Sequence, residues 1–549
     1  MRWAALGYGL FVLLMLPAGV AAMNDDFGYL GSVIETIRRH RPWTDDWLEP
    51  WSASLSALAA ILFKVTGSFQ AATQGLQAIG AAAAGAGTYH LCRMRDISPG
   101  RSLVVSILGL TFPALLWKSL EFTALILYFP CLFWALWAAG RRRWGWFYFA
   151  WLLAFASRQS ATVWLVIPLW IAAREAAASR ERQRWLPPVL VLVGAIVAYG
   201  VLSGGMNQTQ SQRMITQHVF AQVQAAASVR NFAVAVGTFV VFSGLGALAL
   251  GWGAGGLPPP KNLRARIVVT LIVAVGLFSL FDGFPRVFAE HQNYEGWSGR
   301  WYANIVMAAG LAGWLLLRFT FRWELLVAGL AAGLLVGLRA DVWDYYYADV
   351  AILAFFSVAP PRAAEPGENC RLPAAAGLAL VLLLTAFHLG FVFEQKCRVD
   401  RDRAVCVVTE KALRAGSIEV TGIQHAPYGF IGWHLHRHFV AHDGKEDRDI
   451  GGFMRYQRPG AAELSFSPLR FWRDSKSLQE ISGPAQPRVV QSDVFRVGWL
   501  WHQRVTLLRP AAPGQIQPAR LAFDPAQYQK RPFPLTDQEW REHVEAVSR

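Results

Sequence analysis

The feature that most limits the fold of this sequence is a succession of long apolar runs through its first 393 residues. The runs have no clear alternation of apolar and polar positions, as expected of helices surrounded by lipid. Inside a bilayer each backbone polar group must be paired within its own segment, which favours helices. We therefore predict a polytopic α-helical membrane protein with about 11–13 transmembrane helices. The predicted spans are 3–22, 70–91, 102–118, 122–139, 144–157, 160–173, 187–204, 231–251, 267–283, 301–317, 323–338, 344–358 and 373–393.

Composition supports a membrane protein. Hydrophobic residues make up 54% and charged residues 16% of the 549 residues, whereas soluble domains carry about 25% charged residues. An aromatic content of 13% argues against a disordered chain. Five cysteines are too few for a disulfide scaffold. A net charge of +15 could indicate nucleic acid, but in a membrane protein the position of the charges matters more, and we expect no nucleic-acid partner.

The distribution of charge predicts the topology. If the N-terminus is cytoplasmic and the spans alternate, the cytoplasmic loops within residues 1–393 carry a net charge of +12 and the outer loops within the same residues −2. This is the bias expected when positive loops stay inside. It places the segments 23–69, 205–230 and 394–549 outside the inner (plasma) membrane. The alternative for residues 1–22 is a cleaved signal peptide, because the apolar core ends in Val20-Ala21-Ala22. The runs 144–157 and 160–173 are short enough to form a re-entrant hairpin instead of two spans.

Residues 394–549 differ from the rest. No apolar run there approaches the roughly 20 residues needed to cross a bilayer. Stretches of alternating residues broken by Gly, Pro and Asp predict a small, mostly β, periplasmic domain that ends in a helix near Thr536–Val547. Cys397 and Cys406, nine residues apart, could form a disulfide in an oxidising compartment, and two free thiols are the alternative. The alternating stretches are Val407–Thr409, Ser417–Val420, Val489–Val494 and Gln503–Leu507.

Two adjacent acids, Asp25 and Asp26, stand directly after the first predicted span. Neighbouring like charges raise the pKa of one carboxyl group, which suits a general base or a cation site. An acidic helix cap is the alternative. Two amphipathic helices are predicted to follow, at Phe27–His40 and Ser52–Phe63, before the second span.

This order of features resembles the GT-C glycosyltransferases, and among them the bacterial arabinose/mannose transferase-like members. Asp25, Asp26 and Tyr29 match the acidic pair and following aromatic residue of their first outer loop. Glu49-Pro50-Trp51 resembles the entry to the second helix of that loop, and Lys64–Gly67 resembles its exit.

Three further segments match the family more loosely. Lys118-Ser119-Leu120-Glu121 lies where family members often have an acidic residue between the third and fourth spans. Ser157–Trp164, which contains Arg158 and Gln159, is similar to a segment preceding a span in the lipid-linked glucosyltransferase branch. Gly299-Arg300-Trp301-Tyr302 is similar to a motif at the start of a late span.

The resemblance implies an integral membrane glycosyltransferase. It would transfer a sugar from a polyprenyl-phosphate donor, with inversion, to a glycan, lipid or protein acceptor at the outer face of the membrane. Asp25 is the expected base, with Asp26 second, and Glu121 would hold substrate or help bind a divalent cation. Metal dependence stays open; such an ion, Mg²⁺ or Mn²⁺, would have oxygen ligands. The residues expected to contact substrate are Tyr29, Glu49, Gln159 and Tyr302.

Cations near the leaving phosphate should stabilise the charge that grows in the transition state. Arg158 is the strongest candidate, because it lies in a long apolar stretch where an unpaired charge would cost several kcal/mol. It could instead pair with Glu121 inside the bundle, and Arg339 could pair with the nearby Asp341 and Asp344. The full set of candidates is Arg158, Arg300, Arg339 and Lys118.

Three other interpretations are considered. A transporter or flippase would be expected to show internal repeats and charges near the midplane, and the two halves of this chain do not resemble each other. An envelope-assembly scaffold would have no use for the acidic pair. His434, His436 and His438 would share one face of a strand and could bind zinc; a polar, solvent-facing strand is the alternative.

Overall fold

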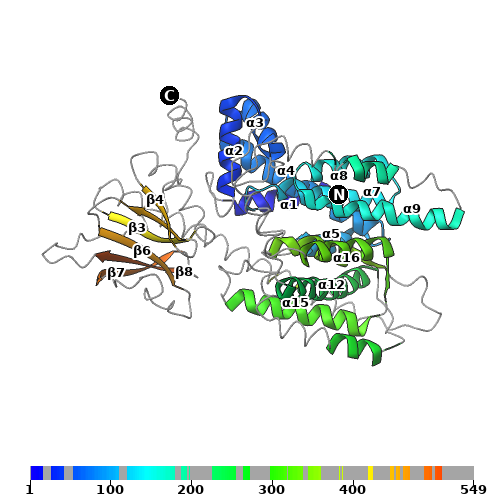
Figure 1. Cartoon of the computed structure of the whole chain (residues 1–549). Helices are drawn as coiled ribbons and strands as arrows, with labels where there is room; N and C mark the ends of the chain where they lie inside the picture. Colours follow the sequence, from blue (N-terminus) through cyan, green and yellow to red (C-terminus); the bar gives the residue numbers. More distant parts are fainter. Residues whose placement is uncertain are drawn as a thin grey trace.

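The structure is a computed structural model, and most of the residues that it describes are helical (Figure 1). The described residues are 2–16, 26–42, 53–110, 120–179, 187–194, 197, 225–254, 262, 264–271, 297–317, 319–337, 344–359, 382–383, 386, 418–424, 445–449, 453–457, 462–469, 488–497 and 501–509.

The helices follow the predicted apolar runs closely, because each predicted run is helical wherever its residues are described, apart from short turns at the ends of a few runs. The α-helices are α1 (Arg2–Met15), α2 (Asp26–Arg39), α3 (Ala53–Thr66), α4 (Phe69–Arg93), α5 (Pro99–Leu110), α7 (Leu125–Gly140), α8 (Trp144–Phe155), α9 (Val166–Ser179), α12 (Ala225–Ala254), α15 (Trp297–Leu316), α16 (Trp323–Gly337) and α17 (Ala348–Ser357). Two 3-10 helices are η2 (Gln159–Leu165) and η4 (Asp344–Tyr347).

One described helix is long and apolar enough to cross a membrane, namely the Asn231–Trp252 part of α12. Several described helices are apolar but shorter, between 10 and 17 residues. The predominantly helical fold is thus confirmed. Passage of the chain through the membrane 11–13 times stays a prediction.

Small residues allow the helices at the centre of the molecule to approach closely. α12 packs against α15, α16 and α17. A methyl group at Gly244 of α12 would overlap the carbonyl oxygen of Gly310, and one at Gly313 would overlap that of Gly244. Gly246 lies equally close to the backbone of Phe355 in α17. Helix pairs in membranes are typically joined by small residues of this kind.

Large apolar side chains are exposed on many helices. On α1, Trp3 is 80% and Leu14 71% exposed, although the opposite face of this helix packs on α4. Soluble monomers rarely expose extensive apolar surface. The other exposed positions include Leu58, Ile61 and Val65 of α3, Trp146, Phe149 and Leu152 of α8, Val189, Leu190, Val193 and Val197, Ile267, Val268 and Leu271, and Leu330 and Leu334 of α16.

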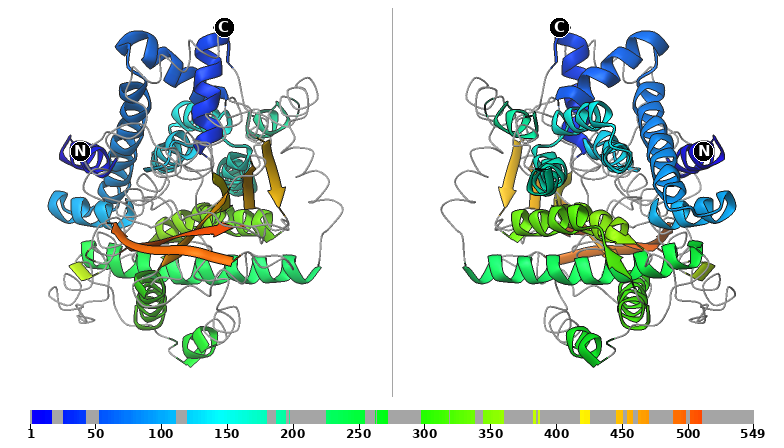
Figure 2. Two further views of the ribbon diagram at one scale, coloured as in Figure 1. Left: turned by 90° about the vertical axis from the view of Figure 1, so that its left-hand side faces the viewer. Right: turned by 90° about the vertical axis from the view of Figure 1, so that its right-hand side faces the viewer.

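The two helices predicted after the acidic pair are present as α2 and α3, which pack side by side at one edge of the helical part (Figures 1 and 2). α2 is amphipathic as predicted, because Leu30, Val33 and Ile34 are buried while its C-terminal arginines reach the surface. The prediction that α3 is amphipathic is wrong. Its buried face is apolar, and its outer face is also rich in leucine, isoleucine and valine.

Six strands form one sheet in the C-terminal part of the chain, with the order β4-β5-β3-β6-β8-β7. β3 and β6 are parallel and the other neighbours are antiparallel. Three of the predicted alternating stretches fall on β3, β7 and β8; that residues 394–549 form a separate periplasmic β domain stays a prediction. The strands are β3 (Ile418–Gln424), β4 (Lys445–Asp449), β5 (Phe453–Gln457), β6 (Ala462–Leu469), β7 (Arg488–Val497) and β8 (Trp501–Arg509).

A further pair of short strands, β1 (Thr320–Phe321) and β2 (Val358–Ala359), joins the loop before α16 to the end of α17. Several predictions lie outside the described residues. They are the disulfide between Cys397 and Cys406, the outer loop up to residue 224, the strand at Val407–Thr409, the histidine strand at 434–438 and the helix at Thr536–Val547.

Candidate functional site

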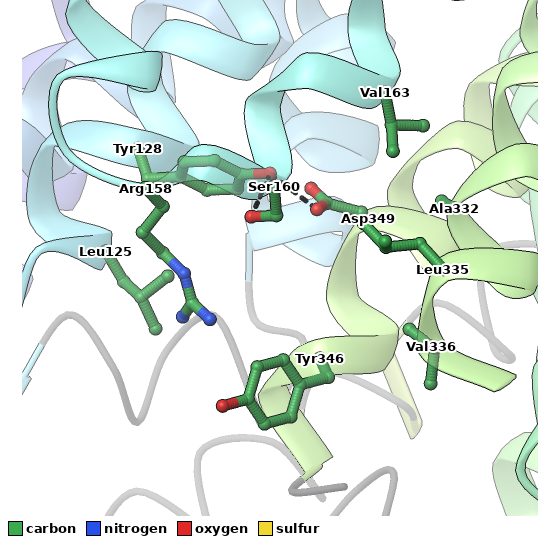
Figure 3. A pocket seen from close by; sticks show the side chains of 10 residues that line it. All are labelled: Leu125, Tyr128, Arg158, Ser160, Val163, Ala332, Leu335, Val336, Tyr346 and Asp349. Atoms are coloured by element: carbon green, nitrogen blue, oxygen red, sulfur yellow. Dashed lines mark hydrogen bonds between the residues drawn. The ribbon is translucent and has the colours of Figure 1, made fainter. Parts of the chain in front are cut away.

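A cavity between α7, η2, α16, η4 and the start of α17 is lined by both polar and apolar side chains (Figure 3). The space between its lining atoms, including the solvent at its open mouth, is about 380 Å³. Its polar lining residues are Tyr128, Arg158, Ser160, Tyr346 and Asp349, and its apolar ones are Leu125, Val163, Ala332, Leu335 and Val336.

The chain's local geometry sets Arg158 at this cavity. α8 ends at Phe155, and Arg158 has an extended backbone (φ −155°, ψ 132°) before η2 begins. The guanidinium carbon lies 5.2 Å from the ring centre of Tyr346 and 6.0 Å from that of Tyr128. Aromatic faces attract a cation at this range, so the two rings hold the Arg158 charge at the cavity.

A chain of hydrogen bonds crosses the cavity wall. The Ser160 hydroxyl donates to the Tyr128 hydroxyl oxygen at 3.1 Å, and the Tyr128 hydroxyl donates to Asp349 Oδ2 at 2.5 Å. The second carboxylate oxygen, Asp349 Oδ1, is buried and makes no hydrogen bond of normal geometry with any described residue. The indole N–H of Trp164 is near enough to interact with Asp349 electrostatically.

The cavity is therefore amphipathic. Its apolar lining comes from three helical segments. They are α7 with Leu125, η2 with Val163, and α16 with Ala332, Leu335 and Val336. The outer side of the same helix exposes Leu330 and Leu334, at 44% and 56%. A ligand with a polar headgroup and a hydrocarbon chain would fit walls of this composition.

The predicted outer loop reaches the same region. The Ser54 hydroxyl, in the first turn of α3, donates to the carbonyl oxygen of Ala156 at 2.7 Å. Ala156 stands two residues before Arg158. The start of α3 therefore lies beside the segment that carries Arg158, although 102 residues separate the bonded pair.

The charge on α2 is internally balanced. Glu35 forms ion pairs with Arg38 at 2.6 Å and with Arg39 at 3.0 Å. Burial raises the pKa of Glu35, but the hydrogen bonds and positive charges of Arg39 and Arg38 outweigh this, so the pKa lies below its ordinary value.

The structure describes only some of the predicted site residues. Asp26 is the first residue of α2, and Tyr29 is half-buried one turn later. Gln159 is the first residue of η2 and half-buried. Arg300 and Tyr302 lie in the first turns of α15, where the side chains are outside the description. Asp25, Glu49, Lys118 and Arg339 lie outside the described residues altogether.

Glu121 is fully buried just before α7. Its neighbour Leu120 accepts a hydrogen bond from the Gln77 amide of α4 at 2.9 Å. Glu121 precedes Tyr128 by only seven residues in the sequence but does not line the cavity. The Arg158 guanidinium lies over two tyrosine rings, and its predicted pairing with Glu121 stays a prediction.

Sequence reasoning missed Tyr128, Tyr346 and Asp349 as site residues. Asp349 did carry a usable signal. An ionisable residue inside an apolar run such as 344–358 is a candidate functional residue. Tyr128 carries no such signal, because its role depends on a partner 221 residues away.

Among the residues that the structure describes, no group of three or more His, Cys, Asp or Glu side chains could hold a metal ion. Comparison with known proteins gave no match: no protein-family model, no curated protein and no solved structure matches this chain.

Proposed function

We propose that the chain is an integral membrane glycosyltransferase of the GT-C type. It would take a sugar from a polyprenyl-phosphate donor at the outer face of the inner membrane and transfer it to a glycan, lipid or protein acceptor. The single observation that carries the proposal is the amphipathic cavity at Arg158. Its lining combines a cation, hydroxyl groups and a carboxylate with apolar side chains.

A membrane location is supported by the exposed apolar side chains of α1, α3, α8 and α16. It is also supported by the contacts between loops. Predicted cytoplasmic ends touch one another, since the Arg95 guanidinium donates to the carbonyl oxygens of Phe356 and Val358 and Arg142 pairs with Glu175 at 2.9 Å.

Other contacts follow the same alternation. Arg101 donates to the carbonyl oxygen of Trp252 at 3.4 Å, and Arg266 donates to that of Trp314 at 2.8 Å. All four ends are cytoplasmic in the predicted topology. The predicted outer ends meet separately, through Ser54 and Ala156 and through Gln77 and Leu120.

In the proposed reaction, the acceptor hydroxyl attacks the anomeric carbon while polyprenyl phosphate leaves. Asp25 removes the proton from the attacking hydroxyl, with Asp26 as the second candidate. The Arg158 guanidinium stabilises the negative charge that grows on the phosphate, for which its two-pronged geometry is suited. The apolar wall of the cavity binds the first prenyl units.

The test measures turnover of a polyprenyl-phosphate donor that carries a radioactive hexose or pentose, in membranes containing the protein. The variant Asp25→Asn should lose about 10²- to 10⁴-fold in rate, since a general base supplies that factor. Arg158→Gln should lose about 10²-fold or more. The variant Arg142→Gln is the matched control, because it removes an arginine from an exposed ion pair on the other side. It should retain the wild-type rate.

Full turnover in Asp25→Asn would exclude this base. Equal rates for Arg158→Gln and Arg142→Gln would remove the role of Arg158. Donor turnover in wild-type membranes that is no higher than in membranes lacking the protein would contradict the proposed function.

A further inference from the structure

The most unusual polar group outside the predicted machinery is Asp349, which is held in the wall of the Arg158 cavity by Tyr128. We infer that Asp349, positioned by Tyr128 and Ser160, binds hydroxyl groups of the donor's sugar and thereby selects the headgroup. This inference rests on the proposed function, because it concerns a second part of the same cavity.

The direction of the hydrogen bonds leaves Asp349 with capacity to accept. Ser160 gives its proton to the Tyr128 oxygen, so the Tyr128 proton points at Asp349 Oδ2. Oδ1 has no hydrogen bond of normal geometry among the described residues. The indole N–H of Trp164 approaches Asp349 but without normal hydrogen-bond geometry. A buried carboxylate oxygen that lacks a full hydrogen bond is destabilising, and a donor on the ligand would recover that free energy.

The chemistry of a carboxylate suits a sugar better than a phosphate. A sugar carries several O–H donors, and a hydrogen bond from a hydroxyl to a charged acceptor is about twice as strong as a neutral one. A phosphate has no donor at neutral pH and would be repelled by Asp349. The cavity thus separates two functions, with Arg158 suited to the phosphate and Asp349 to the hydroxyl groups.

The neighbouring rings complete this assignment. Tyr128 and Tyr346 both line the cavity, and Figure 3 shows the Arg158 side chain extending between Leu125 and the ring of Tyr346. Tyr128 is buried between Trp164 and Arg158 and serves to hold Asp349. The half-buried ring of Tyr346 is the aromatic surface left for the C–H groups of a sugar, beside the carboxylate that accepts from its hydroxyl groups.

The experiment compares two probes, polyprenyl phosphate and polyprenyl-phosphate-linked hexose, whose binding to the purified protein is measured by native mass spectrometry. The quantity of interest is the ratio of their affinities. Asp349→Asn keeps the size of the side chain and an acceptor for Tyr128, so it isolates the charge. It should lower the ratio about 10- to 100-fold and leave the affinity for polyprenyl phosphate unchanged or higher.

Three variants serve as references. Arg158→Gln should weaken both probes and leave the ratio near that of the wild type. Glu324→Gln makes the same chemical change in the ion pair with Arg322, outside the cavity, and should alter neither affinity. Tyr128→Phe removes the hydrogen bond that positions Asp349 and should lower the ratio by a smaller factor, which keeps the inference testable if Asp349→Asn does not fold.

The outcomes distinguish a failure of the inference about Asp349 from a failure of the proposed function. If Asp349→Asn and Tyr128→Phe leave the ratio unchanged, or weaken both probes equally, the inference about Asp349 is overturned and the proposed function stands. If the wild-type protein binds neither probe, the proposed function fails and the inference fails with it.

Discussion

At the scale of single residues, the charges of the helical part are matched to nearby groups. Arg95 is the clearest case, because its guanidinium donates to two carbonyl oxygens at the end of α17. Loss of solvent, together with the nearby charge of Arg322, lowers its pKa to about 9. The side chain therefore stays protonated at neutral pH. It stabilises carbonyl groups that have no hydrogen-bond partner within the helix, at the C-terminus of α17.

The ion pairs of Glu35 predict a pH dependence of helix α2. A carboxyl group whose pKa is lowered by folding contributes stability above its unfolded-state pKa of roughly 4.5, and this contribution is lost as the pH falls through the folded value. Two such pairs, spaced three and four residues apart, contribute about 0.3–0.5 kcal/mol each. At pH 7 the amides of residues 26–42 should therefore exchange about 2- to 5-fold faster in Glu35→Gln than in the wild type.

Hydrogen-exchange mass spectrometry of that peptide at several pH values checks this. The difference between the two proteins should shrink as the pH falls below about 4.5 and vanish once Glu35 is protonated in both the folded and the unfolded state. A difference that is constant with pH, or grows in acid, would show that the ion pairs are not its source.

Part of the site could be predicted at this scale. Arg158 was singled out because a guanidinium inside an apolar stretch is costly unless it has partners, and the structure supplies two aromatic rings. The partners themselves could not be predicted. Tyr128 and Asp349 are joined by a hydrogen bond between α7 and α17, and a single sequence gives no measure of which distant helices are neighbours.

At the scale of the elements, helix packing depends on small residues at crossing points. Gly244, Gly310 and Gly313 bring the backbones of α12 and α15 into contact. The Arg101 and Arg266 side chains then bind the carbonyl groups at the ends of these two helices. Glycine thus fixes where the helices cross, and arginine satisfies their C-termini.

The variant Gly244→Ala should destabilise the protein. Its methyl group would overlap a backbone carbonyl oxygen of α15, so the helices would have to separate, and overpacking of this kind costs about 1–3 kcal/mol. Gly75→Ala in α4 is the matched control, since nothing lies within 4 Å of its added carbon. It should be neutral or stabilising by up to about 1 kcal/mol. Thermal unfolding in detergent compares the two, and equal stability of both variants would contradict the close contact.

The elements themselves were the most predictable part of the molecule. Apolar runs such as 70–91, 231–251 and 323–338 coincide with α4, α12 and α16 within a few residues, because the length and composition of a run are local properties. The amphipathic character of α3 was predicted wrongly. Its outer face is apolar, and its polar side chains lie near its ends, as Ser54 and Thr66 do, or are buried, as Ser56 is.

At the scale of the whole molecule, we propose that two sets of loops lie on opposite sides of a membrane. Among the residues that the structure describes, eight loop ends predicted to be cytoplasmic contact one another through arginine side chains and the β1–β2 pair. The cavity at Arg158 and the start of α3 belong to the other set. This separation follows the positive-inside bias of the sequence, and it would place the cavity where a lipid-linked donor is found.

The most direct test of this arrangement is the labelling of single cysteines by a membrane-impermeant maleimide, in a variant in which all five native cysteines are replaced. Val65, at the end of α3, is 78% exposed, and the Arg142 side chain is 67% exposed on the opposite set. In intact bacterial spheroplasts, Val65→Cys should be labelled and Arg142→Cys should react only after the membrane is permeabilised. Labelling of both positions from the same side would contradict the two-sided arrangement, and with it the placement of the cavity at the outer face.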